Sequence, residues 1–534
     1  MGLFDFIRSR GVVPAKRTQV PDARPAQAMR TQVPDARPAQ AMRAAARAIR
    51  SAFEFKAAAG GRLTGGWSAT TVPADWIITR NLRPLVARSR EQCMNNDYAK
   101  SFLRLCRQNI VGQNGVVMKA AFKKPRGGMD AEVNSALRGA WAKWGHKKNA
   151  SVTGKRSWAA IQRQCVQSAA QDGEFFVRIV TGADAGPWGF SLQVIDPLRV
   201  PIDYNVDQYN QKNFIRHGIE FTQYGRPVAY HLTTVDEGEA EYQYGGVGYV
   251  RVPADEMIHG FIEDLVGQKR GLPWMATALF RLNHMAGFED AAIINARVGA
   301  SKMGFVQWQE GRAPDFDDGD EPGLEFDAEP GTFPVLPDGA ELKEWLPQYP
   351  AGEFLPVYKT LLRGASAGMG VAYNNLANDL ENVNFSSIRQ GTLDEREHWK
   401  EMQEWLIEDL IQPVFEAWLR YSLLKGRIKA SNGTPLSAAL LEKLTDAVTW
   451  QPRRWQWIDP TADVEAAINS MNALLASPGQ IIRDWGNDPS EVWAEIAADI
   501  KAMRDAGIPE QYIMGLLAGK LANPTASEGA HPNS

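Results

Sequence analysis

The chain has 534 residues, of which 44% are hydrophobic and 23% are charged, and its formal net charge at pH 7 is −3. This length exceeds one typical domain and predicts two or three structural regions. No apolar run approaches the roughly 18 residues that a membrane-spanning helix needs, and the first residues lack the apolar core of a signal peptide, so we expect a soluble intracellular product with no membrane partner.

The charge is distributed unevenly along the chain. Residues 1–165 hold 30 Lys and Arg against 9 Asp and Glu, so the remainder must carry a net charge of −24. A basic segment of this kind indicates nucleic acid or acidic protein partners, or else only a solvated face.

A 13-residue sequence at 18–30 recurs identically at 31–43. Its prolines and its few large apolar residues cannot form a packed core, so we interpret residues 1–50 as a disordered basic arm. A recent tandem duplication without a function is the simpler explanation of the repeat itself.

Helical periodicity begins at Ile77 and continues to Val111 in two pieces. The run 95–97 can cap the second piece, and Gly112 can end it. Further helical patterns cover 131–144 and 157–171. The period then changes to two, which predicts strands in hairpins; they cover 174–180, 190–195, 215–221 and 228–232, followed by a strand at 257–262.

The run 270–273 predicts the start of a helix that continues to about Ala300, because proline is common at a helix start. A second helix covers 354–364. Between them, residues 310–353 contain 13 Asp and Glu and only two basic residues, Arg312 and Lys343.

Residues 372–385 interrupt the helical pattern with Asn and Asp, which compete with a helix by bonding to nearby backbone. From Ser386 the helical spacing resumes for almost forty residues, roughly 55–60 Å if straight. Gly391 and Pro413 predict a kink. A helix of that length suits an elongated assembly better than a compact enzyme.

The sequence contains little that indicates a catalytic site. The run 364–368 matches the Gly-x-Ser-x-Gly pattern of a hydrolase, but that motif needs a strand-to-helix turn, and close packing of helices explains it more simply. Residues 154–157 lack the spacing of a phosphate-binding loop. The seven histidines are scattered, and Cys93, Cys106 and Cys165 have no metal-ligand spacing, so we expect no metal, no cofactor and buried thiols in a reducing compartment.

Several segments resemble the lambda-type family of tailed-phage portal proteins. The firmest matches lie at 95–115, 263–275, 361–389 and 455–460, and Gly173-Glu174 with Ile195-Asp196-Pro197 also fits the family pattern. The resemblance covers roughly residues 75–500.

The resemblance implies an α+β, mainly helical portal fold with a mixed α/β wing. After the arm at 1–50, the regions would be the wing at 51–265, a stem helix at 266–302, an acidic clip at 303–350, a second stem helix at 351–372, a tunnel loop at 373–385, a long kinked wing helix at 386–425 and a helical crown region with a tail at 426–534.

The family forms a ring, twelve copies in known members, at one capsid vertex around a channel for double-stranded DNA. The resemblance therefore implies no enzymatic activity of the chain itself and a location in the virion after assembly in the cytoplasm of a bacterial host. The implied partners are other copies of the chain, the major capsid protein or scaffold, the terminase large subunit and the head-tail adaptor.

A channel for sliding DNA should hold few basic groups, because each Lys or Arg that neutralises a phosphate adds affinity. We therefore expect the loop to project into the channel, with Lys359 and Arg363 as the nearest basic groups for phosphate contact; the alternative is that they pair with acidic residues of a neighbouring subunit. The loop candidates are Asn374, Asn375, Asn378, Asp379, Glu381, Asn382 and Asn384.

The clip would present an acidic docking surface to the terminase motor. Its candidate residues are Arg312, Asp315, Asp317, Asp318, Asp320 and Glu321; an acidic solvent-exposed loop without a partner is the alternative. Two other functions stay open for the whole chain, namely a monomeric nucleic-acid-binding scaffold and a serine hydrolase that acts through Ser366.

Overall fold

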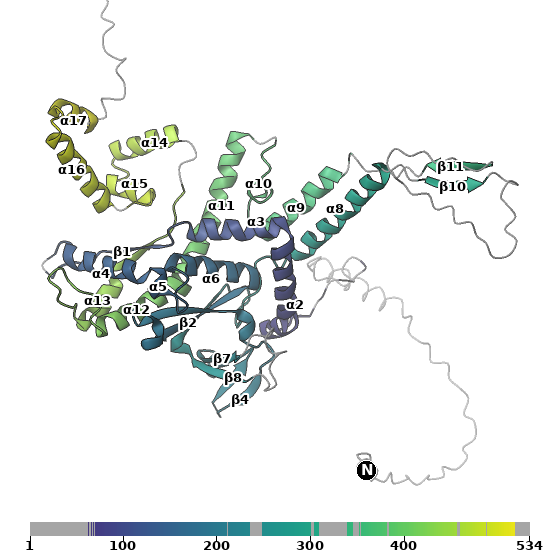
Figure 1. The fold of residues 1–534 in the computed structure, drawn as a ribbon, viewed down its shortest axis with the longest axis horizontal. Coiled ribbons are helices and arrows are strands. Elements are labelled where there is room, and N and C mark those ends of the chain that lie inside the picture. Colours follow the sequence, from purple (N-terminus) through teal and green to yellow (C-terminus); the bar gives the residue numbers. More distant parts are fainter. Residues whose placement is uncertain are drawn as a thin grey trace, which may run out of the picture. The chain divides into compact units, whose positions relative to one another are not determined.

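The computed structural model describes most of the chain beyond Thr71 (Figure 1). The described residues are 62, 66, 68, 70–125, 127–210, 212–234, 248–300, 304–308, 339–344, 352, 354–381, 384–455, 460–487 and 489–517. The chain divides into two units, Met1–Thr71 and Val72–Ser534, and the second contains the elements below. The predicted arm at 1–50 lies outside the described residues. The second unit is mainly helical with several antiparallel sheets, which confirms the predicted α+β class.

The first helices lie close to where the sequence predicts, although α2 begins three residues before Ile77. Helix α2 covers Ala74–Asn95 and α3 covers Asp97–Cys106, and the Asn96 side chain accepts hydrogen bonds from the backbone of Tyr98 and Ala99 at 3.0 and 3.1 Å. A π-helical turn at Arg107–Val111 follows, and Gly112 ends it with a φ of 71°. The cap and the terminating glycine are local features, so sequence alone identifies them.

The next three helices are α4 at Ala131–Trp144, α5 at Lys147–Ala150 and α6 at Trp158–Asp172. Their aromatic residues pack together. The ring centroid of Trp141 lies 4.7 Å from that of Trp144 and 4.9 Å from that of Trp418, which belongs to a helix distant in the sequence. Such aromatic packing joins the early helices to the second half of the chain, because each ring buries a large apolar area.

The predicted hairpin after α6 is confirmed. Strand β2 (Glu174–Thr181) pairs antiparallel with β3 (Phe190–Ile195) and, on its other side, with β9 (Met257–Phe261).

Short 3-10 turns lie at Ala183–Ala185, Pro197–Arg199, Ala254–Glu256 and Ala438–Leu440.

A second sheet has the order β4-β5-β6-β7-β8. Its strands cover Val206–Tyr209, Asn213–Arg216, Ile219–Phe221, Pro227–Thr233 and Tyr249–Pro253. The prediction of one strand over 215–221 was wrong. His217 and Gly218 adopt φ values of 53° and 79°, so the backbone turns and the segment forms two paired strands.

Two helices, α8 (Leu279–Ala300) and α9 (Phe354–Gly368), lie in the segments expected to form the stem, and we call them the stem helices. The segment between them includes the antiparallel strands β10 (Gly304–Trp308) and β11 (Ala340–Glu344). The predicted helix start at 270–273 was wrong by several residues. Arg270 is directed into a buried ion pair, and the chain from 274 to 278 forms turns before α8 begins.

The long helix after the loop comprises α11 (Phe385–Leu406), a π-helical segment (Ile407–Ile411) and α12 (Gln412–Leu424). It continues through Gly391 without interruption, whereas the irregular segment lies directly before Pro413. A proline lacks the N–H that an α-helix uses and crowds the carbonyl four residues earlier, so the widened turn occurs where these two effects act.

The C-terminal part contains α13 (Leu441–Asp446), β12 (Val448–Gln451) and four further helices. Strand β12 pairs with β1 (Val117–Ala120). The helices are α14 at Pro460–Asn472, α15 at Pro478–Asp484, α16 at Pro489–Asp505 and α17 at Glu510–Leu517, as the amphipathic patterns predicted.

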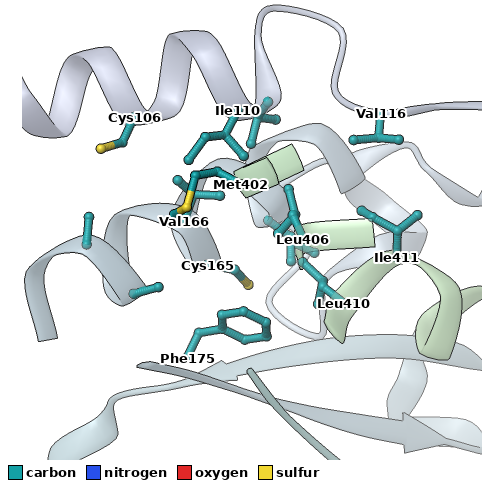
Figure 2. Packing of buried hydrophobic residues seen from close by; sticks show 14 of the residues in the cluster. Cys106, Ile110, Val116, Cys165, Val166, Phe175, Met402, Leu406, Leu410 and Ile411 are labelled. Carbon is teal, nitrogen blue, oxygen red and sulfur yellow. The ribbon is translucent and has the colours of Figure 1, made fainter. Parts of the chain in front are cut away.

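The main core lies where α3, α6, β2 and α11 meet. Figure 2 shows Cys165 of α6 and Phe175 of β2 among aliphatic side chains, with Leu406 and Leu410 from the end of α11 and its π segment. All three cysteines are buried and unpaired, as predicted, and burial raises the pKa of the Cys93 thiol to about 12. The core therefore joins the wing helices to the long helix that follows the loop.

A buried ionic network lies beside this core and collects residues that carry the family resemblance. Glu174 Oε1 lies 2.6 Å from Nη2 of Arg270, Glu174 Oε2 lies 2.9 Å from Nε2 of His259, and each of the three side chains is at most 5% exposed. Arg270 also donates to the backbone oxygens of Val200 and His217 at 3.0 and 2.8 Å. This wing network fixes the chain just before α8.

Candidate channel loop and stem

The two stem helices pack antiparallel, side by side (Figure 1). The hydroxyl of Thr277, just before α8, donates to the carbonyl of Gly368 at 3.1 Å, and the Tyr358 hydroxyl donates to Glu289 at 3.2 Å. Thr277, just before α8, contacts the end of α9, whereas Glu289, further along α8, contacts a residue near the start of α9. The two helices are therefore antiparallel. The end of α9 that leads into the loop is therefore held by the beginning of α8.

The Gly-x-Ser-x-Gly run lies inside α9, where its two glycines face residues at the start of α8 and just before it. A Cβ at Gly368 would lie 2.8 Å from Oγ1 of Thr277, and a Cβ at Gly364 would lie 3.1 Å from Nε of Arg281. The Ser366 side chain is buried and its hydroxyl donates to the carbonyl of Arg363 at 2.9 Å. These residues allow the two helices to pack closely. The segment is helical and does not form the strand-to-helix turn of a nucleophile elbow.

The predicted interruption after α9 is confirmed. Gly370 adopts a φ of 69°, α10 (Tyr373–Ala377) forms a single short helix, and Asn378 adopts left-handed φ and ψ values of 54° and 35°. Asparagine tolerates that conformation better than other residues with a Cβ. The short helix was not predicted from the sequence, because its asparagines indicated irregular structure.

One feature of this loop is a charged cluster that we call the Lys359 clasp, formed by Lys359, Tyr373, Asp379 and Glu381. The Lys359 ammonium lies 3.0 Å from Asp379 Oδ2 and 3.6 Å from Glu381 Oε2. The Tyr373 hydroxyl donates to the same Asp379 oxygen at 2.7 Å, and the backbone N–H of Glu381 donates to Oδ1 at 3.0 Å. The clasp connects the middle of α9 to the tip of the loop.

These contacts change the ionisation of the clasp. The hydrogen bond from Tyr373 and the one from Lys359 lower the pKa of Asp379 to about 2. The hydrogen bond to Asp379 raises the pKa of Lys359, and burial followed by the bond to Asp379 raises that of Tyr373. Asp379 therefore stays anionic and Lys359 stays cationic over the physiological range, so the two charges offset each other.

Arg363, the second predicted basic residue, lies one turn further along α9. Its guanidinium carbon is 5.4 Å from the centroid of the Tyr373 ring, within the range of a cation–π interaction. The same tyrosine therefore contacts Arg363 with its ring and Asp379 with its hydroxyl.

The base of the loop is anchored by Glu395 of α11. Its carboxylate accepts a hydrogen bond from the backbone N–H of Ala372 at 3.3 Å and another from the Asn375 side chain. Burial raises the pKa of Glu395. Neither Glu395 nor Tyr373 was among the predicted site residues; the partners of Glu395 lie about twenty positions away in the chain, and no local pattern reveals such a pairing.

The remaining predicted loop residues are polar and accessible. Asn374 is half-buried, whereas Asn375, Asn378, Glu381 and Asn384 are exposed. Leu380, which no sequence pattern indicated, is 65% exposed at the tip. Asn382 lies outside the described residues, and so do all the predicted clip residues from Arg312 to Glu321.

The described residues contain no group of three or more His, Cys, Asp and Glu side chains arranged to hold a metal ion. In the same part of the chain, no helix combines the length and the apolar character that crossing a membrane requires.

Comparison with known proteins agrees with the resemblance. Residues 60–403 match the family described as phage portal protein, lambda family. The probable portal protein of Halomonas phage phiHAP-1 is 32% identical over 488 residues, which are 90% of this chain and 92% of that protein. The portal protein of Escherichia phage N15 is 21% identical and covers 88% of this chain and 94% of its own length, and portal protein B of Escherichia phage lambda is 20% identical and covers 88% and 93%.

Among solved structures, the neck of an empty GTA particle contains a chain with a TM-score of 0.41 and 14% identity, covering 80% of this chain and 99% of that one. The virion of a native gene transfer agent particle contains a chain with the same TM-score and identity, covering 77% and 95%. Because the family match extends over most of the chain and one relative is 32% identical over nearly its whole length, the chain belongs to the lambda family of phage portal proteins.

Proposed function

We propose that copies of this chain form a closed ring at one capsid vertex, and that double-stranded DNA enters the head and later leaves it through the hole in the ring. Twelve copies is the number that family membership implies. The ring would assemble in the bacterial cytoplasm with the major capsid protein or scaffold, receive the terminase large subunit during packaging and then bind the head-tail adaptor. The chain would guide DNA and catalyse no reaction.

The observation that carries this proposal is the charge balance of the Lys359 clasp. Each cation that neutralises a phosphate releases counterions and adds affinity, and copies in a ring multiply that effect. Here Asp379 and Glu381 already lie beside the ammonium of Lys359. A phosphate that approaches Lys359 would have to compete with two carboxylates, so the loop supports passage of DNA and disfavours retention.

The ion pairs of Lys359 lie within one copy of the chain, and its pairing with a neighbouring subunit stays an expectation. Its carboxylate partners belong to its own chain, so a neighbouring subunit is not required to hold it. Phosphate contact by Lys359 and Arg363 stays a prediction, and in this proposal it is brief and weak. The stacking of Arg363 on Tyr373 also restrains the Arg363 guanidinium.

Electron microscopy of the purified full-length chain tests the assembly. The proposal predicts closed rings with a central hole and the loop around Asp379 facing that hole. Single subunits would contradict the ring, and a loop enclosed within the interior of one subunit would contradict its role in the channel.

The loop is tested by the double substitution Asp379→Lys and Glu381→Lys in a packaging assay. The reversal removes both partners of Lys359 and adds two cations per copy, so packaging should slow or stall. The control is Asp184→Lys with Glu442→Lys, which makes the same change in charge at two exposed positions outside the loop. Packaging that is equal for the two variants would remove the loop from the mechanism.

A further inference from the structure

A cleft of about 1290 Å³ in the wing has no role in the channel proposal. Residues of α3 and its π-helical turn line one side, residues of α6 line another, and the end of β3 with the chain after it also contributes. Figure 1 shows α3 and α6 next to each other, and contacts between them agree with this view. Both walls belong to the same packed core, so the cleft is a fixed part of the wing.

The lining of the cleft is basic and polar. Seven arginines and two aspartates line it, together with several glutamines, and no aromatic or methionine side chain does. The glutamines Gln164, Gln167 and Gln171 follow one another at helical spacing along α6, so this face of the helix is polar from Gln164 to its end. Protein–protein interfaces usually have the opposite composition at their centre, where aromatic residues are enriched and charges are depleted.

Both aspartates form ion pairs with Arg90. Arg90 lies 2.8 Å from Asp172 and 2.6 Å from Asp196, at the end of the cleft near β3. In the described part of the chain no carboxylate lies within ion-pair distance of five others, which are Arg104, Arg107, Arg156, Arg163 and Arg453. The excess positive charge is therefore concentrated away from Arg90.

Three of these five arginines are held in place by neutral acceptors. Nη1 of Arg163 donates to the carbonyls of Gly112 and Gln113 at 3.0 and 2.9 Å. Nη1 of Arg453 donates to the carbonyl of Gln108 and to the Asn109 side chain, both at 2.7 Å, and Arg107 donates to Gln167 at 3.2 Å.

Neutral acceptors orient a guanidinium without cancelling its charge. A guanidinium has five N–H donors, so the remaining donors of Arg163 and Arg453 are available to a ligand. Burial also lowers the pKa of Arg453, which means that its charge is poorly solvated. An anion that binds there would meet oriented donors and would lose little side-chain entropy.

The π-helical turn at Arg107–Val111 supplies both acceptors of Arg453. Its irregular backbone directs the carbonyls of Gln108 and Asn109 away from the helix, toward Arg453 and Gln403. Such turns are often found at functional sites. Here the turn forms one wall of the cleft.

We propose that this cleft binds the phosphate backbone of double-stranded DNA at a second site, separate from the channel. Several oriented arginines with glutamines between them provide the donors that backbone phosphates accept, and the absence of aromatic side chains from the lining disfavours stacking of bases. The site would hold DNA that lies outside the hole of the ring, and in this respect it contrasts with the neutral channel loop. An acidic surface of a second copy of the chain is the competing occupant that the test below separates.

The test measures binding of a covalently closed duplex minicircle to the purified full-length protein between about 50 and 200 mM NaCl. A closed circle cannot thread a ring that has already closed, so its binding reports surfaces outside the channel. Arg104→Gln with Arg156→Gln removes two cations whose side chains are exposed, which limits the risk to folding. We expect affinity about tenfold weaker and a salt dependence with a slope smaller by about one for each arginine removed.

The matched control is Arg226→Gln with Arg420→Gln, which removes two exposed arginines outside the cleft. This pair should bind the minicircle as the unchanged chain does. Equal binding by both pairs, or equal loss in both, would overturn the proposal. Light scattering measures whether each variant still assembles. If the cleft variant alone failed to assemble and its minicircle binding per chain were unchanged, the proposal would also be overturned, because the cleft would then be a contact between copies.

Discussion

The Lys359 clasp and the wing network contain the same kind of ion pair in opposite environments. In the clasp, the side chains of Lys359 and Asp379 are 25% and 18% exposed, whereas those of Arg270 and Glu174 are each 1% exposed in the wing. A pair that retains contact with water is weakened by solvent screening and contributes little to stability. A buried pair is costly to form, and loss of one partner leaves an unsolvated charge.

The difference separates the roles of the two clusters. The wing network holds β2, β9 and the chain before α8 in one arrangement, so its main effect is on folding. The clasp sets the charge that the loop presents, so its main effect is on what approaches the loop. Substitutions in the two clusters should therefore affect different measurements.

The largest effect is expected for Glu174→Gln. The change leaves the Arg270 guanidinium buried beside a neutral amide, and loss of one partner from a buried ion pair costs about 3–5 kcal/mol. Chemical denaturation at matched protein concentration measures this loss. Glu256→Gln is the control, because the pair of Glu256 with Arg178 is partly exposed and should contribute less than about 1 kcal/mol. Equal losses for the two variants would contradict the role of burial.

Acid should destabilise the chain through the same network. Burial alone would raise the pKa of Glu174, but attraction to Arg270 and hydrogen bonds from His259 and Arg270 outweigh it and lower the pKa to about 2. Because the pKa is lower in the folded state, the stabilisation is complete above about pH 4.5 and is lost as the pH falls toward 2.

His259 acts in the same direction, since burial lowers its pKa and its protonation on unfolding favours the unfolded chain below about pH 6.5. Denaturation at a series of pH values should show stability that decreases on acidification. The Glu174→Gln variant should lack the part of this decrease that lies between about pH 4.5 and 2; an identical profile for both proteins would assign that part to other carboxylates.

A smaller loss is expected for Gly173→Ala. Gly173 has a φ of 97°, and a Cβ there would lie 2.4 Å from the backbone carbon of Leu272, so both the conformation and the space oppose a side chain. We expect a loss of about 2–3 kcal/mol. Gly225→Ala separates the two effects, because its φ of 82° is similar but nothing lies within 4 Å of the added atom. The free energy of unfolding of that control should decrease by only about 1 kcal/mol. A larger decrease would show that the backbone conformation matters more than the steric overlap.

The smallest effect on stability is expected for Tyr373→Phe in the clasp. The change removes the hydroxyl that bonds to Asp379 and leaves the ring beneath Arg363, so the pKa of Asp379 should rise from about 2 while the melting temperature stays unchanged. Packaging should slow by about twofold or less, since Lys359 still neutralises the carboxylate. A large decrease in melting temperature would show that the clasp is a structural element like the wing network.

Much of the fold was predictable from local sequence. The cap at Asn96, the glycine at 112 that ends the π turn and the hairpin of β2 and β3 each depend on neighbouring residues, and all were predicted correctly. The strand at 215–221 and the start of α8 were not, because His217 and Arg270 satisfy contacts with distant segments.

The candidate site was likewise predictable only in part. The sequence placed Asp379 and Glu381 in one polar interruption and Lys359 on the helix before it. It did not show that the three lie together, or that Tyr373 donates to Asp379, because the side-chain directions depend on the left-handed turn at Asn378.

By itself the sequence determined the class of the fold, most of its long helices, the hairpin of β2 and β3 and the family to which the chain belongs, because periodicity, caps and motif residues are all encoded over short stretches. Only the tertiary structure decided which charges are compensated. Ion pairs such as Lys359 with Asp379, and uncompensated arginines such as Arg163 and Arg453, depend on distances between residues that are far apart in the chain. Electrostatic energy decreases with distance and with solvent screening, so the same residues acquire opposite roles according to where packing places them.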